Sequence, residues 1–228
     1  MAMIDFDEFL KNRPALHSWD GGITYNDGGI TAETFLCIRD LLAQTPTRPP
    51  FVIETGAGAT TIAFLLLGCS PVVTIAPDQA LWDRIDQYLA LNRIASTSLV
   101  RVVDYSEFAL PRLCEQYRQR GQLADFGLID GAHEYPAVFT DFCYINALLM
   151  EGGHLAIDDV QLHSPKELAR FLSRSSDFVL VADLKKSLIF RKTTGRPLVG
   201  NFSSHRYLTE MTDQYARLPD PYALFDNG

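Results

Sequence analysis

The sequence is poor in features that would point to a secreted, disulfide-bonded or membrane protein. It has only four cysteines in 228 residues. No two of them are close in sequence, so they are expected to be reduced thiols and not a disulfide framework or a zinc site. They are Cys37, Cys69, Cys114 and Cys143. The longest apolar run, residues 62–68, is too short to cross a bilayer. The N-terminal residues lack a basic start followed by an apolar core, so we expect no secretory signal and a cytoplasmic protein.

Positive charge is also scarce. Twenty Lys and Arg residues stand against 28 Asp and Glu residues, which gives a formal net charge of −8. No Lys/Arg cluster stands out, and the basic run at 118–120 is typical of a solvated helix end. The charge therefore argues against nucleic acid or an anionic membrane as a partner.

The chain has enough apolar residues for a sizeable core, 47% of the sequence, and they follow an alternating pattern. Short apolar runs predict strands, and longer amphipathic segments between them predict helices. Strands are expected at 51–54, 71–76, 99–104, 125–130 and 153–159, with a hairpin over 177–193. Helices are expected at 5–12, 31–43, 60–67, 79–92, 108–120, 136–150 and 164–174. Strands separated by helices predict a doubly wound parallel sheet, with the hairpin adding antiparallel strands at its end.

The expected organisation is one structural domain with extensions at both ends. Residues 1–50 would form N-terminal helices and a glycine-rich loop, 51–193 the α/β domain, and 194–228 a C-terminal extension without clear periodicity. The sequence "SPKE" at 164–167 predicts a capping box that starts a helix. The loop, which contains Trp19 and Tyr25, is either a lid over a ligand or a flexible connector.

A glycine turn follows the first predicted strand, in "VIETGAGATT". Glu54 ends the strand, and Gly56, Ala57 and Gly58 lead into a helix. Such a turn can hold a dinucleotide pyrophosphate or the amino-acid end of S-adenosylmethionine, or it can pack without a ligand. The dinucleotide fingerprint needs a glycine where Thr61 stands, and an acid at position 54 favours a cationic amino-acid ligand.

Carboxylates follow the next two strands of the expected sheet. Asp130 ends one strand, and Asp158 and Asp159 end its neighbour, so all three are expected at the rim where doubly wound proteins bind ligands. Clustered carboxylates need a cation, and hard oxygen ligands suit Mg²⁺. The alternatives are a turn acid for Asp130 and helix caps for the other two, although Ser164 and Glu167 already provide a cap for the next helix.

A histidine lies beside the first of these acids, in "FGLIDGAHEY". The unperturbed pKa of an imidazole, about 6.5, suits proton removal near neutral pH. His133 is therefore a candidate general base. The alternative is a residue at a helix start that donates to the backbone.

Four segments in this order resemble class I S-adenosylmethionine-dependent methyltransferases, and most closely their small-molecule O-methyltransferase branch. The segments are "ETGAGATT", "DYSEFALPRL", "LIDGAHEY" and "GGHLAIDDV". The resemblance, which covers about residues 28–193, implies a seven-stranded sheet in the order 3-2-1-4-5-7-6. It places Glu54, Gly56 and Gly58 around the methionine half of the cofactor, and Asp104 and Ser106 near its adenine.

The resemblance also implies a metal site and one departure. Metal-dependent members of the branch have ligands at positions matching Asp130, Asp158 and Asp159, with Asp130 beside the cofactor as well. The family usually has a ribose-binding acid where this chain has Ala76. Asp78 either reaches the ribose instead or caps the following helix. Losing a hydrogen bond to a charged group would weaken cofactor binding by about ten- to a hundredfold.

The predicted function is methyl transfer from S-adenosylmethionine to a hydroxyl of a small molecule, with Mg²⁺ orienting the acceptor and His133 taking the proton. One alternative is a binding module of methyltransferase ancestry without catalysis, which Ala76 would favour. The other is an NAD-dependent oxidoreductase, which Thr61 disfavours. The aromatic tail packs either on its own domain or on a second copy, as a homodimer.

Overall fold

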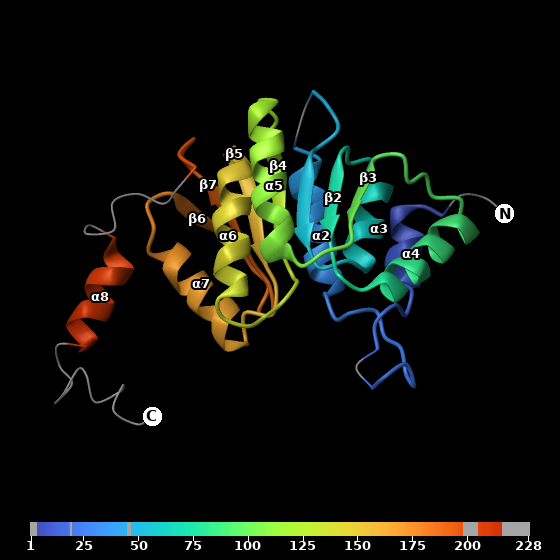
Figure 1. Ribbon diagram of the computed structural model, residues 1–228, viewed down its shortest axis with the longest axis horizontal. Coiled ribbons are helices and arrows are strands. Elements are labelled where there is room, and N and C mark those ends of the chain that lie inside the picture. Colours follow the sequence, from blue (N-terminus) through green and yellow to red (C-terminus); the bar gives the residue numbers. More distant parts are fainter. Residues whose placement is uncertain (1–3, 19, 45–46, 198–204, 216–228) are drawn as a thin grey trace.

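The computed structural model describes residues 4–18, 20–44, 47–197 and 205–215. A seven-stranded sheet in the order β3-β2-β1-β4-β5-β7-β6 forms its centre (Figure 1). The strands are β1 (Val52–Thr55), β2 (Val72–Ile75), β3 (Leu99–Val102), β4 (Ala124–Ile129), β5 (Leu149–Ile157), β6 (Phe178–Asp183) and β7 (Leu188–Lys192). Strands β1 to β5 pair in parallel, and β7 is antiparallel to both β5 and β6. The predicted fold class, strand order and C-terminal hairpin are confirmed.

Helices cover both faces of the sheet. They are α1 (Phe6–Lys11), α2 (Ala32–Leu42), α3 (Ala59–Leu66), α4 (Gln79–Leu91), α5 (Ser106–Gln119), α6 (Ala137–Leu148), α7 (His163–Ser173) and α8 (Arg206–Tyr215). Helices α1 to α4 share one apolar core with one face of the sheet, centred on fully buried Phe64 and Trp82. Helices α5 to α7 share a second core with the opposite face, around Leu110, Ile145 and Leu168. The fold is therefore a three-layer α/β/α sandwich (Figure 1).

The strand order reverses next to β1, which pairs with β2 on one side and β4 on the other. In the register of these strands, Thr55 lies beside both Ile75 and Ile129. The residues that follow, Gly56 and Asp130, therefore leave the sheet side by side. Ligands of doubly wound proteins bind at this kind of reversal, outside the carboxyl ends of the strands.

One expectation outside the sheet is corrected. The capping box at 164–167 is wrong, because α7 begins one residue earlier after Leu162 and has no side-chain cap. The carboxylate of Glu167 instead accepts hydrogen bonds from Arg170 at 2.8 Å and from the Tyr207 hydroxyl at 3.1 Å. The C-terminal extension, whose sequence shows no clear periodicity, contains α8.

Contacts with α7 explain why α8 was missed. Just before α8, the ring of His205 stacks on Phe171 with 4.3 Å between ring centroids. Arg174 also pairs with Glu210. These tertiary contacts do not appear in local periodicity. None of the helices in the described part of the chain has the length and apolar composition that crossing a bilayer requires.

Candidate active site

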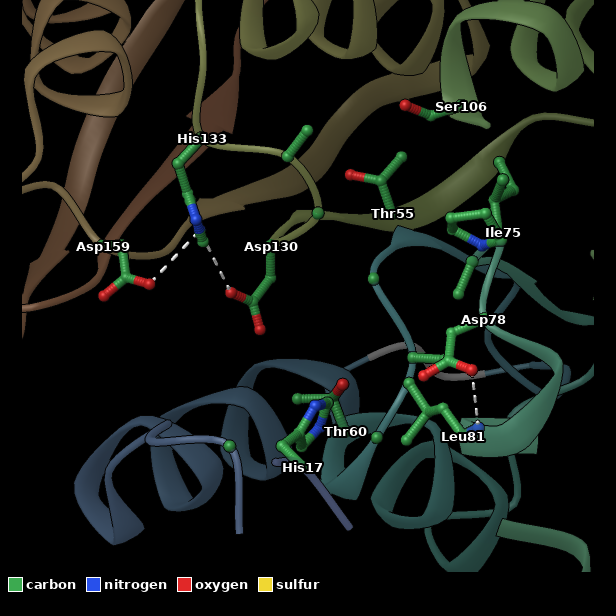
Figure 2. Close-up of a pocket in the computed structure, with 18 of the residues that line it drawn as sticks. His17, Thr55, Thr60, Ile75, Asp78, Leu81, Ser106, Asp130, His133 and Asp159 are labelled. Atoms are coloured by element: carbon green, nitrogen blue, oxygen red, sulfur yellow. Dashed lines mark hydrogen bonds and ion pairs between the residues drawn. The ribbon is translucent and has the colours of Figure 1, made fainter. Parts of the chain in front are cut away.

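A cavity of about 430 Å³ lies at the carboxyl ends of β1, β2 and β4. One end is formed by the glycine turn and the start of α4, and the other by Asp130, His133 and Asp159. Figure 2 shows these two groups facing a common space. Its volume lies within the range usual for small-molecule sites.

The glycine turn is required by how closely β1 and β4 end beside each other. Gly56 has a φ of +86°, which residues with a Cβ rarely adopt, and a Cβ there would lie 2.2 Å from the carbonyl oxygen of Asp130. The turn leads directly into the N-terminus of α3, where Ala57, Gly58 and Ala59 line the cavity.

Glu54 lies in β1 just before this turn and does not line the cavity. Its carboxylate is fully buried and accepts hydrogen bonds from the hydroxyls of Thr60, Thr61 and Thr74, at 2.7, 2.6 and 2.7 Å. Burial raises the pKa of Glu54 to about 7, and the three hydroxyls act in the opposite direction. The carboxylate thus joins β1, β2 and α3, and Thr61, where a dinucleotide fold needs glycine, is one of its donors.

The tip of β2 shows what stands at the expected ribose position. Ala76 is 4% exposed and lines the cavity, and its carbonyl accepts a hydrogen bond from the Trp82 indole at 3.0 Å. Asp78 also lines the cavity. It caps α4, because its Oδ1 accepts from the backbone N–H groups of Ala80 and Leu81 at 2.8 and 3.2 Å. Figure 2 draws the hydrogen bond from Leu81. Its Oδ2 lies 3.6 Å from Arg84. Asp78 is thus a helix cap that also faces the ligand space.

His17 is a cavity residue that sequence reasoning missed. It comes from the N-terminal segment, which is held by a β-bridge between His17 and Asn26 and by a 2.7 Å hydrogen bond from Arg84 to the Leu16 carbonyl. A Cβ on Gly58 would lie 2.5 Å from His17 Nε2, so the imidazole packs directly against the glycine turn. Burial lowers the pKa of His17. No local motif marks this residue, because its partner is about 40 positions away.

The sequence left open whether the loop around His17 is a lid or a connector; two of its residues, Asp27 and Gly28, line the cavity. The ring of Tyr25 lies under the Arg84 guanidinium, 5.1 Å away, and Tyr25 does not line the cavity. Trp19, the other residue proposed for the lid, lies outside the described residues.

The predicted adenine residues are separated in the structure. Ser106 lines the cavity at the start of α5. Asp104 does not line it, since its carboxylate accepts from Arg112 at 2.6 Å and from the Tyr105 N–H at 2.9 Å. A different acid, Asp141 of α6, is fully buried near Ser106. Burial raises the pKa of Asp141 to about 6, while the hydroxyls of Ser106 and Thr55 lower it. Its signal in the sequence is an acid within the apolar stripe of α6.

Asp130, His133 and Asp159 come together at the other end of the cavity (Figure 2). His133 Nε2 lies 3.2 Å from Asp159 Oδ2 and 3.8 Å from Asp130 Oδ1. The three side chains are each 18–31% exposed. Asp159 has a φ of +54°, an unusual conformation that commonly marks functional sites. His133 therefore lies beside the carboxylates that follow β4 and β5.

Neighbouring charges and burial shift the pKa values of these three side chains. The carboxylate of Asp130 raises the pKa of His133, and the charge of Asp159 adds to the effect although burial opposes it. Burial raises the pKa of Asp130 to about 6. For Asp159 burial acts upward, but hydrogen bonds from Gln161 and Lys186 outweigh it and lower the pKa. The imidazole thus lies between Asp130, whose pKa is raised, and Asp159, whose pKa is lowered.

The three acids predicted to hold Mg²⁺ do not form an open ligand set. The side chain of Asp158 is fully buried. It accepts a hydrogen bond from Ser187 and forms an ion pair with Lys186. The ligand atoms that do converge belong to Asp130, His133 and Asp159. A metal there would use the histidine as a ligand and remove it as a base. The predicted ligands Asp130 and Asp159 therefore converge, but the predicted third ligand, Asp158, does not join them.

No protein-family model matches the sequence, and no curated protein matches it. Solved structures do match its fold. A protein from Staphylococcus aureus proposed to be a caffeoyl-CoA O-methyltransferase is 13% identical, with a TM-score of 0.59 over 73% of this chain and 85% of that one. The methyltransferase MycE of mycinamycin biosynthesis, solved with Mg, S-adenosylhomocysteine and mycinamycin VI, is 14% identical, with a TM-score of 0.51 over 72% of this chain and 50% of that one.

A third structure bears on the partner. An rRNA methylase from Streptococcus thermophilus is 16% identical, with a TM-score of 0.50 over 69% of this chain and 95% of that one. At such identities the likeness establishes the fold of S-adenosylmethionine-dependent methyltransferases, as the sequence resemblance predicted. Because one of these proteins is an rRNA methylase, the fold does not support the predicted exclusion of nucleic acid.

Proposed function

We propose that this chain is an S-adenosylmethionine-dependent methyltransferase that modifies a hydroxyl group of a small molecule. One observation carries the proposal: a single cavity joins the glycine turn at Gly56 to His133, which lies between two carboxylates. A binding module would need the first of these features but not the second.

The residues at the glycine turn fit this cofactor. The N-terminus of α3 opens into the cavity, and its N–H groups and positive potential suit a carboxylate such as that of a methionine moiety. Asp78 and Ser106 supply oxygen atoms toward the places where a ribose and an adenine would lie. When bound, S-adenosylmethionine supplies a methyl group on a positively charged sulfur, ready for attack by an oxygen nucleophile.

The protein's part in the reaction is to position the acceptor and remove its proton. The imidazole of His133 would accept the proton of the acceptor hydroxyl as the oxygen attacks the methyl carbon and the methyl–sulfur bond breaks, which releases S-adenosylhomocysteine. Asp159 and Asp130 would stabilise the imidazolium that forms, since both lie within 4 Å of Nε2. No step is assigned to a metal ion.

A small acceptor is favoured over RNA by charge. The chain carries a formal charge of −8, and the acceptor end of the cavity is formed by two acids. RNA binding depends on phosphate neutralisation by Lys and Arg. The outcome that would favour RNA is methylation of RNA and of no small hydroxylated compound.

Calorimetry tests the cofactor first. S-adenosylhomocysteine is titrated into chelator-treated protein, with and without Mg²⁺, and NAD serves as the control ligand. Micromolar binding of S-adenosylhomocysteine without binding of NAD supports the proposal. Absence of binding in both conditions refutes it. If the cofactor binds but no hydroxylated compound or RNA accepts a methyl group, the non-catalytic binding module becomes the better account.

A further inference from the structure

Lys186 places an ammonium group inside the acidic rim. It lies in the turn between β6 and β7, and its Nζ is 2.8 Å from Asp158 Oδ2 and 3.1 Å from Asp159 Oδ1. It also donates to the carbonyl oxygen of Gly29 at 3.0 Å. An ammonium has three N–H donors, and these three acceptors match them in number. The lysine thus ties the hairpin to both acids and to the N-terminal segment.

Both carboxylate oxygens of Asp158 accept hydrogen bonds from side chains of the protein. Its Oδ2 accepts from Lys186, and its Oδ1 accepts from the Ser187 hydroxyl, which lies 3.2 Å from the hydroxyl of Thr34. The side chain is fully buried. A buried carboxylate is stable only when it is paired and hydrogen-bonded, and this one is. Each of its two oxygens already has a donor within the protein.

Asp159 connects this buried pair to the candidate base. Its Oδ1 accepts from Gln161 at 2.6 Å and contacts Lys186, while its Oδ2 faces His133 at 3.2 Å. Two adjacent carboxylates repel each other unless a cation lies between them. The lysine supplies that charge, and its bonds to both acids raise its pKa although burial opposes this. The position of Asp159, and through it that of His133, therefore depends on Lys186.

We propose that Lys186 is the resident cation of this rim, taking the place that a divalent metal would occupy between Asp158 and Asp159 and acting as a positioning residue for His133. The part of this statement that concerns His133 rests on the proposed function. The part that concerns the cation does not.

Binding of Mn²⁺ tests the cation directly. Mn²⁺ accepts the same carboxylate ligands as Mg²⁺ and is detected by electron paramagnetic resonance of the free ion. The chelator-treated full chain is compared with Lys186→Met and with Lys185→Met. Lys185 is the matched control, because it lies in the same turn with an exposed side chain. We expect weak binding by the wild type and the control, and binding at least about tenfold tighter by Lys186→Met, since the acids lose their counter-ion.

Loss of Lys186 leaves the buried carboxylate of Asp158 without its counter-ion. The variant is therefore also examined by thermal unfolding. We expect Lys186→Met to melt below the wild type and to recover on addition of Mn²⁺, because a ligand of the native state stabilises it. Lys186→Arg should keep the wild-type behaviour. The proposal is overturned if the wild type already binds Mn²⁺ as tightly as Lys186→Met. It is equally overturned if Lys186→Met, folded or unfolded at the start, gains no more from Mn²⁺ than the control.

Measurements on the same samples distinguish a failure of this proposal from a failure of the proposed function. A wild type that binds neither Mn²⁺ nor S-adenosylhomocysteine would remove the methyltransferase assignment and leave the role of Lys186 intact. A wild type that binds both ligands would support the methyltransferase assignment and overturn the role of Lys186.

Discussion

Replacing Gly56 with alanine should separate the two reasons why glycine is needed in the turn. Gly68 is the matched control: its φ of +74° is close to the +86° of Gly56, but a Cβ there would meet nothing within 4 Å. Both variants place an L-residue in the left-handed region, which costs about 1–2 kcal/mol. Only Gly56→Ala also drives a methyl group to 2.2 Å from the Asp130 carbonyl oxygen. The ends of β1 and β4 must then separate, at an additional cost of about 1–3 kcal/mol.

Urea unfolding and calorimetry with S-adenosylhomocysteine would measure the difference. Gly68→Ala should lose about 1–2 kcal/mol of stability and keep wild-type ligand affinity, because it lies at the far end of α3. Gly56→Ala should be less stable than this control and bind the ligand at least about tenfold more weakly, since the displaced strand ends shape the cavity. Equal stability and equal affinity of the two variants would refute the close approach as the reason for Gly56.

Three further predictions concern titratable side chains of the site. Because the pKa of Glu54 is raised to about 7 in the folded state, the stability of the wild type relative to Glu54→Gln should fall by about 3 kcal/mol as pH rises from 4.5 to 8; a pH-independent difference in urea unfolding would contradict this. NMR titration should give His133 a pKa above 6.5, and Asp130→Asn should lower it, whereas an unchanged value would exclude Asp130 as its main partner. His17→Ala should weaken S-adenosylhomocysteine binding by up to about tenfold in calorimetry without a comparable loss of stability; unchanged affinity would mean that His17 only covers the turn.

Local sequence was sufficient to predict features that depend on chain direction and strand ends. The glycine turn could be placed because its residues follow a buried strand directly. The convergence of Asp130 with Asp159 could be predicted because neighbouring parallel strands end at the same edge of a sheet. In both cases the signal lies within a few residues of a strand end.

Features that depend on distant partners could not be predicted. His17 packs on Gly58, and Lys186 pairs with Asp158; each pair is separated by about 30 to 40 residues with no pattern to connect them. Local propensity also misjudged Glu167, whose carboxylate is bound by Arg170 and Tyr207 instead of a helix start. These interactions depend on how the elements pack, which periodicity does not report.

Asp158 and Asp159 show that sequence cannot predict the roles of even two adjacent acids. Both follow β5, and the sequence predicts the same metal-binding role for each. Successive side chains of an extended chain point to opposite sides, so Asp158 turns inward to Ser187 and Lys186. Asp159 adopts a φ of +54° and points toward His133. Only the backbone conformation distinguishes a buried structural acid from one that faces the cavity.

The carboxylates at the strand ends are each neutralised in a different way, and they differ in whether they face the cavity. Glu54 is surrounded by three hydroxyls beneath the turn, and Asp158 is closed off by Ser187 and the ammonium of Lys186. Neither faces the ligand space. Asp130 is balanced instead by His133, whose ring can gain and lose a proton, and this pair lines the cavity. Proton transfer to or from a bound acceptor is therefore possible at Asp130 and His133, and a substitution there should change catalysis more than it changes the fold.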